Sequence, residues 1–268
     1  MISYAQNFED VILWRALKEI KNGFYVDVGA NHPTSSSVTK WFYDNGWSGI
    51  NIEPHPFCFE LLKSERPRDI NLQYAISERP GEIDFYLLNA HGLSTAKPDI
   101  AAFHGENGMT FDSIRVESDT LGNILDLYAN NEIHFLKIDI EGFEEVAISS
   151  INFEMIRPWI FCIEATKPMS LEENYNEWEG FLLDADYELC YKDGLNRFYL
   201  SKEQAHLLPR FELPPGIFDD FVKYQEGDDA ILLRINELEH ELLKVKTSRS
   251  WLLTKPLRSI MRRIQKLH

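Results

Sequence analysis

Short apolar runs alternate with longer mixed segments along most of the chain. Uninterrupted apolar runs are typical of strands buried on both faces, and the segments between them suit covering helices. The pattern therefore predicts an α/β fold with a mainly parallel sheet between two helical layers. Predicted strands occupy 24–28, 49–53, 70–75, 133–139, 158–164, 187–192 and 196–200. Predicted helices occupy 7–20, 35–45, 56–64, 120–130, 142–150 and 171–185.

Residues 81–118 interrupt this alternation. Two strand-like runs, GEIDFYLL and MTFDSIRVES, flank a polar segment rich in Gly and Pro. This arrangement predicts an inserted hairpin or lid. A second turn signal, Asp193-Gly194, divides the last two predicted strands into an antiparallel hairpin that closes the seven-stranded sheet.

The character of the sequence changes after Pro214-Pro215-Gly216. We therefore expect a main domain over 1–213, a linker over 214–226 and a helical tail over 227–268. Apolar residues from Ile231 to Val245 recur at alternating spacings of four and three, which indicates a short coiled-coil seam and a homo-oligomer. The final residues form a basic amphipathic pattern that suits an anionic membrane surface, a protein partner or the acidic domain itself.

Composition and charge narrow the class of protein. The hydrophobic content of 44% supports a buried core, and the net charge of −16 opposes nucleic-acid binding, which needs a basic surface. The segment from Leu242 to the end is the exception, with eight basic residues and no acidic ones. Three widely spaced cysteines, no leader-like start and no long apolar stretch predict a cytoplasmic protein whose tail could reach the inner membrane face.

The run FYVDVGANHP, residues 24–33, predicts a nucleoside site at the end of the first strand. Gly29 permits a tight turn, and Asp27 and Glu53 place carboxylates where hydroxyls or an ammonium would bind. The second and third glycines of a pyrophosphate-binding loop are absent. An adenosine ligand without phosphate, such as S-adenosylmethionine, therefore fits better than a dinucleotide.

The run HFLKIDIEGFE, residues 134–144, carries the strongest chemistry. Charged Lys137, Asp139 and Glu141 alternate in an apolar strand, and the next strand ends at Glu164. Asp139 and Glu164 could hold a divalent metal, Mg or Mn, or one carboxylate could take a proton directly. Hydrogen bonds that order the loops are the structural alternative.

Other polar residues are weaker candidates for the site. His32, His104 and His134 are potential bases, and His32 is the best placed because it follows the cofactor loop. The run DGLNRFYL offers Asn196, Arg197 and Tyr199 as substrate ligands that suit a sugar, although a hairpin turn explains its first two residues equally well.

Six segments together resemble the FkbM-type family of S-adenosylmethionine-dependent methyltransferases, particularly bacterial members found with polysaccharide biosynthesis. They are SYAQNFEDVIL, FYVDVGANHP, SVTKWFYDNGWSGINIEPHP, IHFLKIDIEGFEEV, RPWIFCIEAT and DGLNRFYL. The resemblance spans about residues 2–205. It implies a class I methyltransferase, Rossmann-like fold and O-methylation of a sugar hydroxyl in a nucleotide sugar or surface glycan.

Single residues receive expected roles. Asp139, Glu141 and His32 are the expected catalytic residues, because of their place at the end of a strand and after the cofactor loop. The terminal SRSWLLTKPLR is similar to a segment of bacterial glycan-assembly proteins, which implies a glycan-assembly partner for the tail. The expected cofactor-binding residues are Gln6, Asp27, Gly29, Ala30, Asn31, Ser37, Glu53, Pro54, Ala75 and Ile76.

Two other functions stay open at this stage. One is a nicotinamide-dependent sugar oxidoreductase, which would need a pyrophosphate cradle. The other is a catalytically silent scaffold that recruits glycan-assembly enzymes through its C-terminal helices. Intact Asp27, Glu53, Asp139 and Glu164, at the ends of four predicted strands, argue against silence without excluding it.

Overall fold

The computed structural model describes residues 1–88, 94–108, 110–167, 170 and 172–225. It divides the chain into two compact units, Met1–Lys223 and Tyr224–His268. The coiled-coil seam and basic helix expected in 227–268 lie outside the described residues, so they remain predictions. None of the helices in the described ranges combines the length and apolar character needed to cross a membrane.

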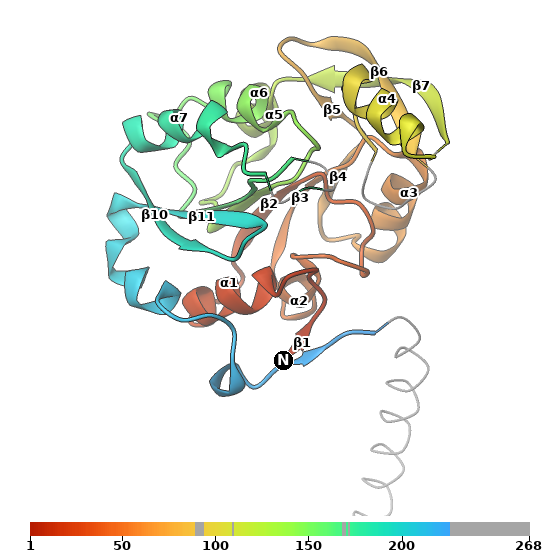
Figure 1. The fold of residues 1–268 in the computed structure, drawn as a ribbon. Coiled ribbons are helices and arrows are strands. Elements are labelled where there is room, and N and C mark those ends of the chain that lie inside the picture. Colours follow the sequence, from red (N-terminus) through yellow and green to blue (C-terminus); the bar gives the residue numbers. More distant parts are fainter. Residues whose placement is uncertain (89–93, 109, 168–169, 171, 226–268) are drawn as a thin grey trace, which may run out of the picture. The chain divides into compact units, whose positions relative to one another are not determined.

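A seven-stranded sheet forms the centre of the first unit (Figure 1), as predicted. Neighbouring strands from β9 to β4 run parallel, and β11 runs antiparallel to both β9 and β10. This order, with one antiparallel strand near the edge, is that of the predicted class I methyltransferase fold. The strands in spatial order are β10 (Tyr187–Lys192), β11 (Asn196–Ser201), β9 (Ile160–Glu164), β8 (Phe135–Ile138), β2 (Phe24–Val28), β3 (Ser48–Ile52) and β4 (Ile70–Leu72).

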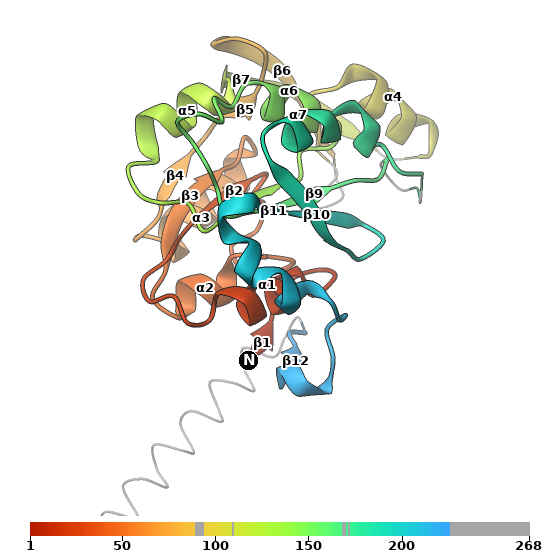
Figure 2. The same cartoon turned by 90° about the vertical axis from the view of Figure 1, so that its left-hand side faces the viewer.

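Helices cover both faces of this sheet (Figure 2) because alternate side chains of each strand point to opposite sides. In β2, Val26 and Val28 pack with α5, α6 and α7 in one apolar cluster, whereas Tyr25 packs with α1 and α2 in another. The sheet is therefore buried on both faces, which explains its continuous apolar runs. These helices are α1 (Glu9–Leu17), α2 (Lys40–Asp44), α5 (Leu121–Tyr128), α6 (Glu144–Ser149) and α7 (Glu179–Asp184), and α3 (Pro56–Glu65) follows β3.

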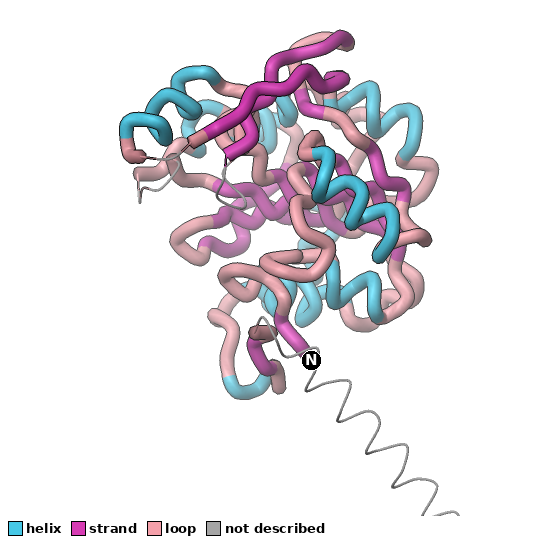
Figure 3. Tube along the Cα trace, turned by 90° about the vertical axis from the view of Figure 1, so that its right-hand side faces the viewer, coloured by secondary structure: helices cyan, strands magenta, loops and turns pink. Residues whose placement is uncertain are grey.

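The inserted region forms its own three-stranded sheet (Figure 3). β6 (Gly81–Leu88) and β7 (Phe111–Asp119) pair antiparallel, which confirms the predicted hairpin. The polar segment between them was expected to be a loop, but it contains α4 (Pro98–Glu106), which begins with a proline in its first turn. The predicted strand 70–75 is also wrong as one element: it divides into β4 and β5 (Ala75–Ile76), and β5 pairs with β7.

Two predicted helices are much shorter than expected. Helix 35–45 reduces to α2 because Ser36 has a left-handed backbone (φ 57°) and bridges Ala5. Helix 171–185 reduces to α7 and the 3₁₀ turn η1 (Tyr175–Glu177), because Thr166 pairs with Glu173 in an extended bridge.

The predicted linker 214–226 instead belongs to the first unit as far as Lys223. After two 3₁₀ segments, η2 (Lys202–Phe211) and η3 (Ile217–Asp219), strand β12 (Val222–Lys223) pairs with β1 (Ile2–Ser3). The Arg15 guanidinium donates to Asp219 Oδ1 at 2.7 Å and to the Leu213 carbonyl at 2.6 Å. These contacts hold the segment on the domain.

Candidate functional site

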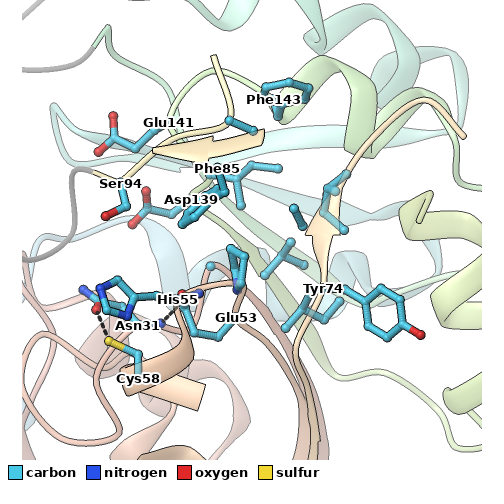
Figure 4. Close-up of a pocket in the computed structure, with 18 of the residues that line it drawn as sticks. Asn31, Glu53, His55, Cys58, Tyr74, Phe85, Ser94, Asp139, Glu141 and Phe143 are labelled. Carbon is cyan, nitrogen blue, oxygen red and sulfur yellow. Dashed lines mark hydrogen bonds between the residues drawn. The ribbon is translucent and has the colours of Figure 1, made fainter. Parts of the chain in front are cut away.

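A cavity opens where β2, β3 and β8 end, and the insert contributes to its wall (Figure 4). The carboxyl ends of parallel strands meet at this edge, which is where ligands bind in open α/β sheets. Lining residues from the main sheet are Val28, Gly29, Asn31, Ile52, Glu53, Pro54, His55, Cys58, Asp139, Ile140, Glu141 and Phe143. Tyr74, Ala75, Ile76, Phe85, Leu88, Ser94 and Ala96 complete the wall from the insert and the segment that leads to it.

Gly29 is required by a close approach between two strand ends. Its backbone is left-handed (φ 76°), and a Cβ atom there would lie 1.9 Å from the Asp139 carbonyl oxygen. A side chain would therefore clash with the backbone after β8, in addition to the strain of this conformation. Gly29 therefore allows the chain after β2 to pack directly against the chain after β8.

The first three amides of the loop after β2 are engaged within the protein. The N–H groups of Gly29 and Ala30 donate to the Ile52 carbonyl at 2.9 and 3.2 Å, and that of Asn31 donates to Glu53 Oε2 at 2.6 Å. Helix α2 begins only at Lys40, well beyond these residues. A pyrophosphate would therefore find neither free amides at these three positions nor an adjoining helix start.

Glu53 lies at the end of β3 with both carboxylate oxygens fixed. Oε1 accepts from the His55 N–H at 2.8 Å, and Oε2 accepts from Asn31. Burial raises the pKa of Glu53 to about 7, although both hydrogen bonds oppose this shift. A carboxylate offers about four acceptor positions, so two remain available to ligand hydroxyls.

Asp27 does not line the cavity, although it was expected to bind the cofactor. Its Oδ2 accepts from the Thr39 hydroxyl at 2.9 Å, and its Oδ1 lies 3.4 Å from the Lys137 ammonium. Lys137 also donates to the Gly29 carbonyl at 2.7 Å and lies 3.4 Å from Asp139. Asp27 therefore orders the loop indirectly, by holding the lysine under it.

Three carboxylates meet beside this lysine, at the ends of β8 and β9. Asp139, Glu141 and Glu164 each place an oxygen within 4.8 Å of the others. Burial, followed by the charge of Asp139, raises the pKa of Glu141 to about 8 and that of Glu164 to about 11. The prediction that these acids gather at one sheet edge is confirmed, with Glu141 reached through a left-handed turn rather than strand alternation.

His32 is not among the residues that line the cavity, although it was expected to be catalytic. Its Nδ1 accepts hydrogen bonds from the backbone N–H groups of Thr34 and Ser35 at 3.1 and 3.0 Å. The imidazole therefore stabilises the turn around Pro33. His134 is structural as well, because its Nδ1 accepts from the Phe24 N–H.

The expected substrate residues on β11 are also internal. Arg197 and Tyr199 are buried and both contact Glu179 Oε1 at 2.8 Å. The Asn196 amide donates to the buried Glu9 carboxylate at 2.8 Å. Their side chains connect β11 to α7 and α1, so they do not line the cavity.

The cofactor prediction divides into two groups. Gly29, Asn31, Glu53, Pro54, Ala75 and Ile76 line the cavity. Gln6 is exposed, Ala30 packs in the interior, and the Ser37 hydroxyl accepts from Arg66, so these three do not line it. The sequence pattern missed Phe85, Leu88 and Ser94, because only the tertiary placement of the insert brings them to the sheet edge. It also missed Phe143, which follows β8.

Comparison with known proteins identifies the family. Residues 27–189 match the model of the methyltransferase FkbM domain. No curated protein matches the chain significantly. Among solved structures, the methyltransferase FkbM from Methylobacillus flagellatus is similar at 16% identity and a TM-score of 0.42, covering 67% of this chain and 43% of that one. A TehB-like SAM-dependent methyltransferase from Corynebacterium glutamicum is similar at 8% identity and a TM-score of 0.41, covering 72% and 88% respectively.

Proposed function

The chain belongs to the FkbM methyltransferase family, and from this premise we propose that it transfers a methyl group from S-adenosylmethionine to a hydroxyl of a sugar. The acceptor is a nucleotide sugar or a bacterial surface glycan. The cofactor binds over the loop after β2, and the acceptor meets it beside the carboxylates after β8.

The observation that carries the proposal is how the loop uses its amides. All three successive N–H groups of Gly29, Ala30 and Asn31 have partners inside the protein, so a pyrophosphate would find no donors there. S-Adenosylmethionine has ribose and adenine without phosphate. Glu53 keeps acceptor positions for the ribose hydroxyls, and apolar Ala75 and Ile76 suit the adenine.

The chemistry requires positioning and removal of one proton. S-Adenosylmethionine supplies a methyl group on a positively charged sulfur. Asp139, the most exposed of the three carboxylates that line the cavity, receives the proton of the acceptor hydroxyl. The acceptor oxygen forms a bond to the methyl carbon as the bond from that carbon to sulfur breaks, and the sulfur keeps the electron pair.

A sugar acceptor is supported by the polar groups on the acceptor side. Asp139, Glu141 and Ser94 line the cavity together and can accept hydrogen bonds from several hydroxyls. The family resemblance to polysaccharide-associated members points the same way. The side chains of Asn196, Arg197 and Tyr199 on β11 have internal partners, so they do not support a sugar acceptor.

The basic tail supports a role for this protein close to the enzymes that assemble glycans. Eight basic and no acidic residues follow Leu242, so we propose that the tail contacts an anionic membrane face or a glycan-assembly partner. Deletion of 227–268 is expected to reduce vesicle association or oligomer size while leaving cofactor affinity intact. Unchanged association in both assays would refute this role.

The test of function is direct product identification. The protein is incubated with isotopically labelled S-adenosylmethionine and nucleotide sugars or glycans of its source, and products are analysed by mass spectrometry. A labelled methyl ether on one sugar is expected. No transfer to any hydroxyl, with intact cofactor binding, would favour the silent scaffold; oxidation of a sugar with NAD would favour the oxidoreductase.

A further inference from the structure

We propose that Asp139, Glu141 and Glu164 form a binding site for one hard divalent cation, Mg²⁺ or Mn²⁺, at the ends of β8 and β9. The sequence suggested only Asp139 and Glu164 as ligands, and the structure adds Glu141. The role given below to the ion rests on the proposed methyl transfer, whereas its binding does not.

The geometry supplies three oxygen ligands from two adjacent strand ends. The three carboxylates each offer an oxygen within 4.8 Å of the others. Ligands of one small cation lie at most about 4.0–4.4 Å apart, since each bond is about 2.0–2.2 Å long. A side-chain shift of a few tenths of an ångström at most would bring the three oxygens within this range. Figure 4 shows the carboxylates of Asp139 and Glu141 on the same side of the cavity.

The charges around the cluster are unbalanced. Within the described ranges, Lys137 is the cation paired with Asp139, and it is shared with buried Asp27. The Lys97 ammonium lies beside Gly142 and the Phe143 ring, and no ion pair in the described part of the chain joins it to these acids. Glu144 adds a further negative charge nearby, although its Oε1 is occupied by the N–H groups of Ile140 and Gly142. The surplus of carboxylates therefore calls for bound protons or a bound cation.

Glu141 gives a second and independent sign of a ligand. It is 93% buried, since only 7% of it is exposed, and its Oε2 has no hydrogen-bond partner among the described residues. Leaving such an oxygen unsatisfied costs about 1–3 kcal/mol. The backbone is also left-handed there (φ 49°), a conformation that is uncommon for a residue with a side chain. The Thr95 hydroxyl holds this turn by donating to the Glu141 carbonyl at 3.1 Å.

The ligand set selects the class of ion. Three carboxylates without sulfur or imidazole suit hard cations such as Mg²⁺ and Mn²⁺, which keep water in their remaining positions. Those positions can accept oxygens of a sugar acceptor in exchange for water.

The position of the site indicates its role. Glu53 follows β3 and the acid cluster follows β8 and β9, so the two lie on opposite sides of the β2 loop in the sheet order. The ion would therefore bind the acceptor rather than the ribose. A hydroxyl bound to it loses its proton more easily, because the positive charge stabilises the alkoxide.

The test measures binding without cofactor or acceptor. The full chain is stripped of metal with a chelator and titrated with MnCl₂, and free Mn²⁺ is followed by electron paramagnetic resonance. One saturable site is expected, and MgCl₂ in excess should displace the Mn²⁺. Glu141→Gln should weaken binding by at least about tenfold, and Glu164→Gln provides a second variant should the first fail to fold.

Glu145→Gln is the matched control, because it removes the same charge from an exposed position four residues away. It should bind Mn²⁺ as the unmodified protein does. Absence of saturable binding, or equal weakening by Glu145→Gln and the cluster variants, would overturn the proposal. A negative result leaves methyl transfer intact, and a failure of methyl transfer leaves the binding result intact, so the two proposals are judged separately.

Discussion

The polar groups on the two sides of the cavity differ in how completely they are hydrogen-bonded within the protein. On the β3 side, Glu53 has both oxygens fixed by backbone amides, and the first three amides of the β2 loop are engaged. On the β8 side, three carboxylates crowd together and Glu141 Oε2 has no partner among the described residues. The first side is preorganised for a neutral sugar ring of a nucleoside, whereas the second needs an added positive charge. Lys137 lies between them and contacts both.

The largest loss of folding stability should follow from a side chain at Gly29, which would push apart the ends of β2 and β8. Gly29→Ala places a Cβ atom 1.9 Å from the Asp139 carbonyl oxygen, so we expect a loss of more than about 4 kcal/mol of folding stability. Gly194→Ala is the control: it has a similar backbone (φ 96°) with open space, and should cost about 1 kcal/mol. Urea unfolding measures both, and equal losses would contradict the close approach.

Removal of the lysine should be the next most damaging change. Lys137→Met leaves buried Asp27 without its cation and releases the Gly29 carbonyl, so we expect a loss of about 3 kcal/mol. Its pKa is raised by Asp27 and Asp139 against the effect of burial, so this contribution persists throughout the neutral range. The exposed pair of Lys202 and Asp186 gives the control, because Lys202→Met should change stability by less than about 1 kcal/mol. Similar losses would refute a central role for Lys137.

Glu53 should make the stability of the ligand-free protein depend on pH. Its folded pKa of about 7 lies above the ordinary value of 4.5, so the folded state holds a proton that the unfolded state has lost. Its contribution is complete below pH 4.5, and roughly 2–3 kcal/mol is lost as pH rises to 7. Glu53→Gln should flatten that slope, and exposed Glu60→Gln should leave it unchanged. Thermal unfolding between pH 5 and 8 measures the slope, and an unaltered slope in Glu53→Gln would contradict the burial argument.

The smallest loss of folding stability is expected for Tyr199 on β11, which lies outside the cavity. Tyr199→Phe removes a buried hydroxyl that bonds Glu179 and Arg197, so we expect a loss of about 1–2 kcal/mol. Because the side chain does not line the cavity, methyl transfer per folded molecule should keep its KM for the acceptor. A KM that rises severalfold at unchanged kcat would restore Tyr199 as a substrate ligand.

The sequence predicted the buried strands and the acids at their ends well. It predicted poorly which side chains line the cavity. The buried strands were evident because apolar runs between turn signals indicate burial on both faces, as in β2 and β9. Acids at strand ends were likewise predictable, because parallel strands bring their carboxyl ends to one edge. Asp27, Asn196, Arg197 and Tyr199 do not line the cavity as expected, since a polar residue inside a strand can point to a buried partner as easily as to a ligand. The part of the cavity wall formed by Phe85, Leu88, Ser94 and Ala96 depends on how the insert packs, and such packing leaves no local pattern in the sequence.

The most direct test of the cofactor side is a titration calorimetry comparison of S-adenosylmethionine and NAD on the full chain and on Glu53→Gln. The account predicts that S-adenosylmethionine binds, that NAD binds far more weakly, and that Glu53→Gln weakens the former by about tenfold. Tighter binding of NAD, or equal affinity of S-adenosylmethionine for both proteins, would contradict it.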